Sequence, residues 1–157
     1  MEKIYRLLYP MGVYLISSTH GGKDNVMTAA WTFPLSIDPP LFGVSIGKSR
    51  FSYRMIDKSK EFVINIPSQD MKEAALICGR NSARDSDKFA LAKLTKEKSA
   101  KVAAPSIAES IISIECEVID SKEIGDHVLF IGKPVNITKR KPGKRIIQNE
   151  EGELKVY

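Results

Sequence analysis

The feature that most limits the fold of this 157-residue chain is a series of short apolar runs, each ended by residues that favour turns. Short runs rich in branched and aromatic residues are typical of β-strands, and Gly, Pro, Asn and Asp are typical of the connections between them. The clearest turns are residues 19–24, Thr-His-Gly-Gly-Lys-Asp, and residues 38–40, Asp-Pro-Pro. We expect strands at residues 13–18, 27–33, 41–46, 61–66, 110–119 and 128–138.

The strand expected at residues 110–119 has the most regular alternation of apolar and polar side chains. Its two faces carry Ile112, Ile114, Cys116 and Val118 on one side and Ser113, Glu115 and Glu117 on the other. In the last strand, Gly132 and Pro134 predict a bulge or bend, because neither residue supports a regular ladder.

Helical spacing is confined to three short segments. We expect Ser49 to cap a helix over residues 50–59, because a serine hydroxyl can accept a hydrogen bond from a first-turn amide. Ser68 is expected to cap a second helix that carries apolar residues at helical spacing as far as Cys78, and a third helix is expected at residues 87–94. Many short strands with few helices predict a mainly β fold, an antiparallel barrel with peripheral helices, as a single domain over residues 1–157.

Composition excludes several classes of protein. A hydrophobic content of 43% with 27% charged residues is typical of a soluble globular chain, and no apolar run approaches the ~20 residues that span a bilayer. Residues 1–8 carry charges too early, and too short an apolar block, for a signal peptide, so we expect a cytoplasmic protein. Two cysteines and two histidines, without metal-type spacing, predict neither a disulfide framework nor a metal site.

The net charge of +5 raises the question of nucleic acid, but charge alone indicates only non-specific attraction. The densest basic run, residues 139–145, contains Pro142-Gly143 and lacks the aromatic residues or groove-reading helix of most nucleic-acid sites. We expect a solvated hairpin tip there and no nucleic-acid partner. A Gly-x-Gly-x-x-Gly fingerprint is also missing, so the chain has no separate dinucleotide-binding domain.

Residues 43–49, Gly-Val-Ser-Ile-Gly-Lys-Ser, imitate a P-loop but have three residues between the first glycine and the Gly-Lys pair, where the motif needs four. Nucleotide triphosphate hydrolysis is therefore not expected. Lys48, Ser49 and Arg50 still suit a monophosphate, because first-turn amides and the helix dipole attract anions, and Ser49 or Ser52 can add a hydroxyl. The structural alternative is a solvated basic turn with a capping serine.

About twenty residues earlier, Thr28, Ala29 and Ala30 form a run of small side chains that would let a flat ligand lie against the backbone. The alternative is a buried strand that accommodates a neighbouring helix, and Trp31 fits either a core or a ligand pocket. Small residues for a ring and a basic helix start for a phosphate together indicate a flavin mononucleotide (FMN) site.

The order and spacing of several segments resemble the flavin-reductase-like family, whose fold is the FMN-binding split barrel, an antiparallel Greek-key barrel. The resemblance covers most of the chain. It rests on residues 9–18, 25–40, 61–66, 78–80 with 87–89, 125–128 (Gly-Asp-His-Val) and 132–135 (Gly-Lys-Pro-Val).

The resemblance implies a set of cofactor contacts. The ring would lie on Thr28, Ala29, Ala30 and Trp31, and the phosphate on Ser45, Ile46, Lys48, Ser49 and Arg50. The outer wall would be Cys78, Gly79, Arg80, Asp87 and Lys88. Arg80, Arg84 and Lys88 are also candidates for the phosphates of a nicotinamide cofactor, while a mobile surface loop and a helix capped by Gly79 remain structural alternatives. His127 is the one candidate catalytic residue, placed to orient the nicotinamide or deliver a proton, although a lone histidine is often structural.

The family resemblance further implies a homodimer and NAD(P)H-dependent reduction of flavin, or of an acceptor such as ferric iron through bound FMN. The main alternative is a flavoredoxin-like electron carrier that exchanges electrons with a protein partner rather than with NAD(P)H. A basic barrel that binds RNA or DNA without flavin, and an activity like that of pyridoxamine-phosphate oxidase, are further alternatives.

Overall fold

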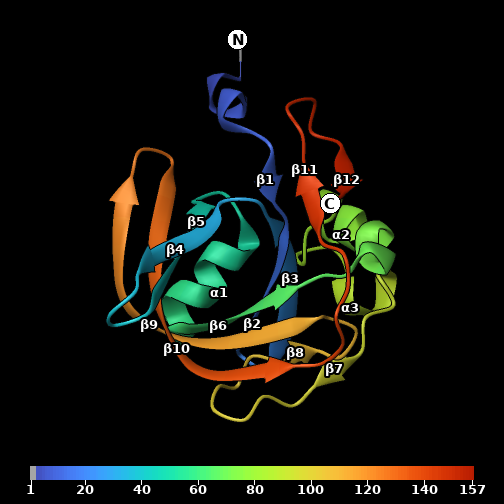
Figure 1. Ribbon diagram of the computed structural model, residues 1–157. Helices are drawn as coiled ribbons and strands as arrows, with labels where there is room; N and C mark the ends of the chain where they lie inside the picture. Colours follow the sequence, from blue (N-terminus) through green and yellow to red (C-terminus); the bar gives the residue numbers. More distant parts are fainter. Residues whose placement is uncertain (1–2) are drawn as a thin grey trace.

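The computed structural model describes residues 3–157. Its main sheet has seven strands in the order β3-β2-β6-β9-β10-β5-β4, with antiparallel pairing between neighbours. These strands are β2 (Tyr14–His20), β3 (Lys23–Ala29), β4 (Thr32–Ser36), β5 (Leu41–Gly47), β6 (Glu61–Ile66), β9 (Ile112–Ile124) and β10 (His127–Lys139). The sheet curls around α1 (Phe51–Ser59), as Figure 1 shows. The expected mainly β, antiparallel barrel is confirmed.

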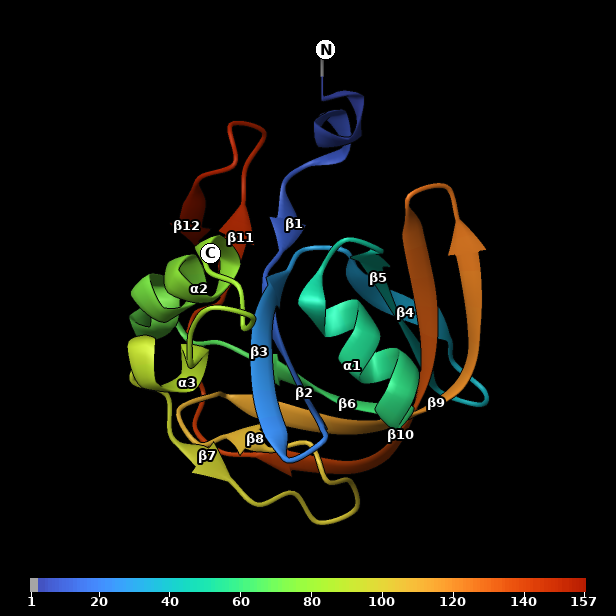
Figure 2. The same ribbon diagram turned by 180° about the vertical axis from the view of Figure 1, so that it is seen from behind.

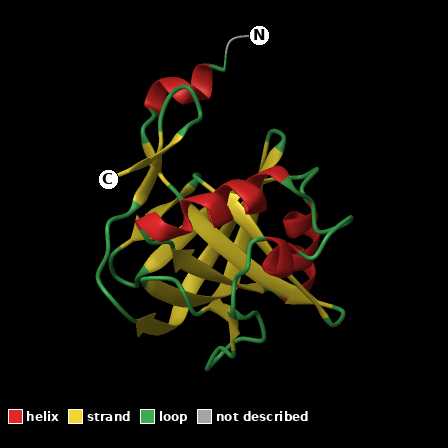
Figure 3. Cartoon of the chain, turned by 90° about the vertical axis from the view of Figure 1, so that its right-hand side faces the viewer, coloured by secondary structure: helices red, strands yellow, loops and turns green. Residues whose placement is uncertain are grey.

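Two smaller sheets complete the β structure. One joins β1 (Met11–Gly12), β11 (Ile146–Gln148) and β12 (Leu154–Val156), and the other pairs β7 (Lys96–Glu97) with β8 (Ser106–Ile107). The β11–β12 hairpin stands beside the N-terminal 3₁₀ helix η1 (Ile4–Leu8) at one end of the molecule (Figure 3). Arg6 Nη1 connects the two by donating to the Glu150 carbonyl at 3.1 Å.

The helices lie on both sides of β2 and β3. Helix α1 occupies the opening between β3 and the long β9–β10 hairpin (Figures 1 and 2), where Ile56 packs into the same core as Ile16 and Phe130. Helices α2 (Lys72–Arg80) and α3 (Lys88–Leu91) cover the other face, with Leu15 and Val26 in their core. Both faces of these strands are therefore buried.

Several boundaries differ from those expected. The strand expected at residues 27–33 is two strands, β3 and β4, which lie at opposite ends of the sheet order, so the chain must turn at Ala30 and Trp31. The Ser49 cap is wrong: α1 begins at Phe51, Arg50 is the residue before it, and no side chain caps the first turn.

The other two helix starts also differ in detail. Ser68 precedes a 3₁₀ turn, η2 (Gln69–Met71), without a capping side-chain bond, and α2 starts after it. The third helix is shorter than expected, and Asp87 caps it by accepting a hydrogen bond from the Ala90 amide at 3.2 Å.

The irregularity expected at Gly132 and Pro134 is confirmed by shifts in the β9–β10 register on either side of these residues. The glycine is needed for packing, because a Cβ at position 132 would lie 2.5 Å from Phe62 Cζ. The absence of a side chain at Gly132 thus lets β10 pass closely over the buried ring of Phe62.

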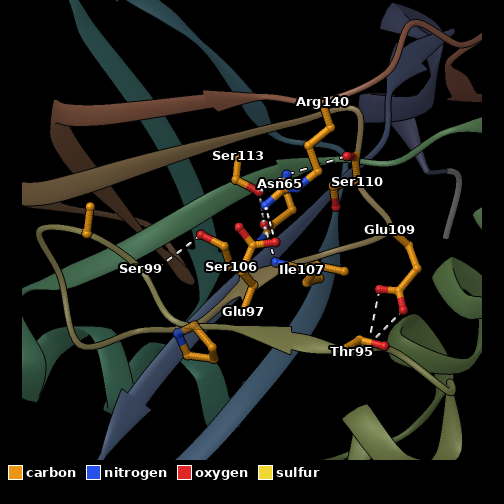
Figure 4. Close-up of polar contacts among 12 residues, drawn as sticks. Asn65, Thr95, Glu97, Ser99, Ser106, Ile107, Glu109, Ser110, Ser113 and Arg140 are labelled. Carbon is orange, nitrogen blue, oxygen red and sulfur yellow. Dashed lines mark hydrogen bonds and ion pairs between the residues drawn. The ribbon is translucent and has the colours of Figure 1, made fainter.

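Part of the polar face of β9 is covered rather than solvated, which the alternation did not indicate. Ser113 and Glu115 are buried, whereas Glu117 is exposed. Figure 4 shows the polar contacts at this face: Asn65 Oδ1 accepts from Ile107 N at 3.0 Å and from Ser113 Oγ at 2.7 Å. No helix in the described part of the chain is both long and apolar enough to cross a bilayer.

Candidate functional site

Two neighbouring cavities share Met27, Thr28 and Arg50 as lining residues. The cationic cavity, of about 250 Å³, is lined by Met27, Thr28, Ser49, Arg50, Phe51, Ser52, Cys78, Gly79, Asn81, Ser82, Ala83, Arg84 and Lys88. The aromatic cavity, of about 360 Å³, is lined by Tyr5, Tyr9, Met27, Thr28, Ala29, Ala30, Trp31, Ser45, Ile46, Gly47, Arg50, Asp126, His127 and Gln148. Because these three residues line both, the two cavities lie side by side, and they differ in chemistry.

The cationic cavity gathers Arg50, Arg84 and Lys88, none of which forms an ion pair with a carboxylate among residues 3–157. Lys88 is 6% exposed, and its Nζ donates to the Cys78 carbonyl at 3.0 Å. Burial lowers the pKa of the Lys88 ammonium to about 8, and the nearby charge of Arg50 acts in the same direction. One buried ammonium and two exposed guanidinium groups without carboxylate partners favour an anion in this cavity.

The start of α1 forms one wall of this cavity. The Tyr53 amide donates to the Arg50 carbonyl at 3.2 Å, no side chain caps the amides before it, and the helix dipole is positive at this end. The Arg84 guanidinium links the opposite wall to this one by donating to the Ser49 carbonyl at 3.3 Å. The result is a small polar enclosure suited to a phosphate group.

Helix α2 approaches β3 closely where the two cavities meet. The Thr28 hydroxyl donates to the Ala75 carbonyl at 2.6 Å, and a Cβ at Gly79 would lie 3.4 Å from Thr28 Cβ. Gly79 lies inside α2, which ends at Arg80 with Asn81 as its cap, so the alternative of a Gly79 cap is wrong. A Cβ at this position would only reach ordinary van der Waals contact with Thr28.

Cys78 is buried beside Lys88 and does not act as a thiolate. Burial raises the pKa of its thiol to about 11, although the Lys88 charge acts in the opposite direction. The side chain therefore stays neutral and packs as a small apolar group.

Aromatic rings form a wall of the second cavity. The rings of Trp31 and His127 lie 4.7 Å apart at 32°, and Tyr5 meets Trp31 edge-on at 5.4 Å. Trp31 Nε1 also donates to the Tyr9 hydroxyl at 3.2 Å. The small residues Ala29 and Ala30 leave room beside this wall for a flat ring.

His127 is held by its sequence neighbour. Its Nδ1 lies 2.7 Å from Asp126 Oδ1, and this contact lowers the pKa of the Asp126 carboxyl. A carboxylate can only accept, so Nδ1 carries the proton and Nε2 remains available to a ligand. Gly47 lies next to this nitrogen, since a Cβ there would be 3.8 Å away.

The structure brings most of the predicted site residues to these two cavities. The cationic cavity holds Thr28, Ser49, Arg50, Cys78, Gly79 and Lys88. The aromatic cavity holds Ala29, Ala30, Trp31, Ser45, Ile46 and His127. Ser45 and Ile46 thus lie at the end opposite to the one expected for the phosphate.

Three predicted residues lie elsewhere. The Lys48 ammonium pairs with Glu123 on β9, and Asp87 caps α3. Arg80 lines a separate cavity of about 160 Å³ beside Gln148 and Leu154. None of the three lines the cationic or the aromatic cavity.

Sequence reasoning missed Tyr5, Tyr9, Asp126 and Gln148, all of which line the aromatic cavity. The position of Asp126 directly before His127 was a usable signal, because neighbouring acid and imidazole groups often pair. The two tyrosines and Gln148 come from the chain ends, and only the packing of η1 and β11 against the barrel brings them here.

The sequence and the fold are both similar to those of known proteins. The model of the flavin reductase like domain matches residues 5–149. The chain is 45% identical over 134 residues to an uncharacterised protein of Pyrococcus abyssi, covering 85% of this chain and 77% of that one. It is 28% identical over 123 residues to the NADH:riboflavin 5′-phosphate oxidoreductase of Streptomyces pristinaespiralis, covering 78% and 67% of the two chains.

Among solved structures, the flavoredoxin of Desulfovibrio vulgaris (Miyazaki F) superposes with a TM-score of 0.86 at 28% identity, covering 95% of this chain and 87% of that one. The domain match spans nearly the whole chain and agrees with the split-barrel architecture. The chain therefore belongs to the flavin reductase-like family.

Proposed function

We propose that this protein binds FMN and catalyses NAD(P)H-dependent reduction of flavin, or of an acceptor such as ferric iron through the bound FMN. The observation that carries the proposal is that the aromatic and cationic cavities lie side by side, with Thr28 and Arg50 lining both. One end suits a flat ring and the other a phosphate. The names of the Streptomyces and Desulfovibrio relatives agree with flavin redox chemistry.

The residues present fit the cofactor. Each cavity is close to the lower end of the ~300–1,000 Å³ typical of ligand sites, and the two are adjacent, with Met27, Thr28 and Arg50 lining both. Arg50, Arg84 and Lys88 would neutralise the phosphate, while the backbone of β3 and Trp31 would hold the ring. When bound, FMN supplies the redox chemistry of hydride uptake from a reduced nicotinamide and electron transfer to an acceptor.

The chain's own part in the reaction is positioning and electrostatics. The wall formed by Tyr5, Trp31 and His127 would orient a flat nicotinamide or acceptor against the ring. His127 Nε2 is the available group for holding or delivering a proton, since Nδ1 is occupied by Asp126. We also propose that two copies pair as a homodimer.

The test is a visible absorption spectrum of the purified protein, followed by anaerobic addition of NADH and then NADPH. Yellow protein that is bleached quickly by either nucleotide supports the reductase. Yellow protein that resists both nucleotides supports an electron carrier served by a protein partner, as the similarity to a flavoredoxin allows. Colourless protein that also fails to bind added FMN overturns the flavin proposal.

A further inference from the structure

We propose that Asn25 is a positioning residue, which directs the Ser52 hydroxyl proton into the cationic cavity as a hydrogen-bond donor to the phosphate. This inference rests on the proposed binding of FMN. Asn25 lines neither cavity, but its contact with Ser52 would determine whether the serine hydroxyl can donate a hydrogen bond to the phosphate.

The contact joins two buried side chains from different elements. Asn25 on β3 is 1% exposed, and Ser52 in the first turn of α1 is 3% exposed. Asn25 Nδ2 donates to Ser52 Oγ at 2.7 Å. Within residues 3–157 the Ser52 hydroxyl has no other hydrogen-bond partner, although it lines the cationic cavity.

The chemistry of the two groups sets the direction of the serine proton. An amide NH₂ can only donate, so it occupies a lone pair of the hydroxyl and leaves the O–H free to donate elsewhere. The cavity holds the charges that attract an acceptor, above all the buried ammonium of Lys88. A hydroxyl donor that lines the same cavity as that ammonium and the start of α1 would complete a phosphate-binding set.

The carbonyl oxygen Oδ1 of Asn25 is buried without a hydrogen-bond partner among the described residues, so Ser52 is the one side-chain partner of this amide in that part of the chain. Turning the amide over would let Oδ1 accept the serine proton and would remove the donor from the cavity. The two orientations of one buried amide therefore offer the phosphate different sites, and variants at position 25 distinguish them.

The experiment measures dissociation constants of FMN and riboflavin for the full-length apoprotein by flavin fluorescence. The variants are S52A, N25L and the double variant, because leucine keeps the approximate size of asparagine without its hydrogen bonds. S18A is the matched control: Ser18 is buried, pairs with Asn25 across β2 and β3, and contacts Met55 of α1, yet it lines neither cavity.

We expect S52A to raise the FMN dissociation constant about tenfold and N25L about fivefold, both with less than about a twofold change for riboflavin, because only FMN carries the phosphate. In the S52A background, N25L should not change the ratio of the two constants further. S18A should leave that ratio at the wild-type value even if it lowers the melting temperature.

Three results would overturn the assignment. Equal weakening of FMN and riboflavin by N25L would make Asn25 a structural residue only. A further change of the ratio by N25L on top of S52A would show that Asn25 does not act through Ser52. An unchanged ratio in S52A would place the hydroxyl proton outside the phosphate site. Failure of the wild-type protein to bind either flavin would instead reject the proposed function.

Discussion

The burial of Lys88 has a measurable consequence for the pKa of its ammonium group. It is a buried ammonium without a carboxylate partner in the described chain, and its pKa is lowered to about 8. Keeping it charged in the ligand-free protein costs roughly 3 kcal/mol, at 1.36 kcal/mol for each pKa unit. The cost is fully present below pH 8 and disappears as pH rises toward the unfolded pKa of 10.5. A bound phosphate dianion would offset this cost.

We therefore expect FMN affinity to fall as pH rises from about 7 to about 9.5, because Lys88 loses its proton while the phosphate is already a dianion. The expected loss is roughly tenfold or more, and riboflavin affinity should stay nearly constant. Fluorescence titrations across this range test the expectation. Lys88→Arg is the matched control, since a guanidinium stays charged and should remove the pH dependence. A pH-independent wild-type affinity would contradict a role for Lys88 in phosphate binding.

His127 gives a second prediction at the scale of one residue. Its Nδ1 faces Asp126, and its ring stacks on Trp31 in the aromatic cavity. His127→Asn should lower the rate of reduction by NAD(P)H roughly a hundredfold, in the range typical of lost general acid–base help, with flavin affinity intact. Stopped-flow bleaching of the bound flavin measures the rate. A rate equal to that of the wild type would show that the histidine is structural.

Among the elements, residues 100–101 are held to the barrel by a buried carboxylate. Glu115 on β9 is 1% exposed and accepts the Ala100 amide at 2.9 Å, the Lys101 amide at 2.6 Å and the Asn136 side chain at 2.8 Å. Burial alone would raise the pKa of the Glu115 carboxyl, but these donors together lower it. The polar face of the strand thus serves to anchor a loop.

This anchor predicts how stability depends on pH. A carboxyl whose pKa is lower in the folded state contributes stability that is present above its unfolded pKa, near 4.5, and is lost as pH falls through the folded pKa. Glu115→Gln should lower the free energy of unfolding at neutral pH by about 2 kcal/mol and flatten its fall in acid. Thermal denaturation at several pH values measures both effects. The exposed neighbour Glu117 is the control, and equal effects of Glu117→Gln would contradict the anchor.

For the whole molecule, exposed apolar residues support the proposed homodimer. Leu8 on η1 is 82% exposed, and Ile37 in the β4–β5 turn is 95% exposed. Ile119, Ile124 and Ile137 of the β9–β10 hairpin are each more than half exposed. Large apolar side chains with this much exposure are candidates for surfaces covered by a second chain.

Light scattering of the purified protein should accordingly give twice the chain mass of 17.5 kDa. Ile37→Asp should shift the population toward monomer, because a buried carboxylate at an interface is costly. Ile37→Val keeps the apolar character and should remain dimeric. A monomeric wild-type protein at micromolar concentration would contradict the dimer.

Local pattern in the sequence determined most of the strands, because alternation and turn residues act over a few positions. It also identified the small residues near Thr28 and the basic residues near Arg50, whose types suit a ring and a phosphate. Tertiary structure alone decided which of them meet. The chain must turn near Trp31, since β3 and β4 lie at opposite ends of the sheet order. Lys48 follows β5 and pairs with Glu123 of β9, because β10 pairs with both of these strands. Long-range packing likewise buried Glu115 and placed Asn25 against Ser52, since no local pattern encodes which distant element covers a side chain.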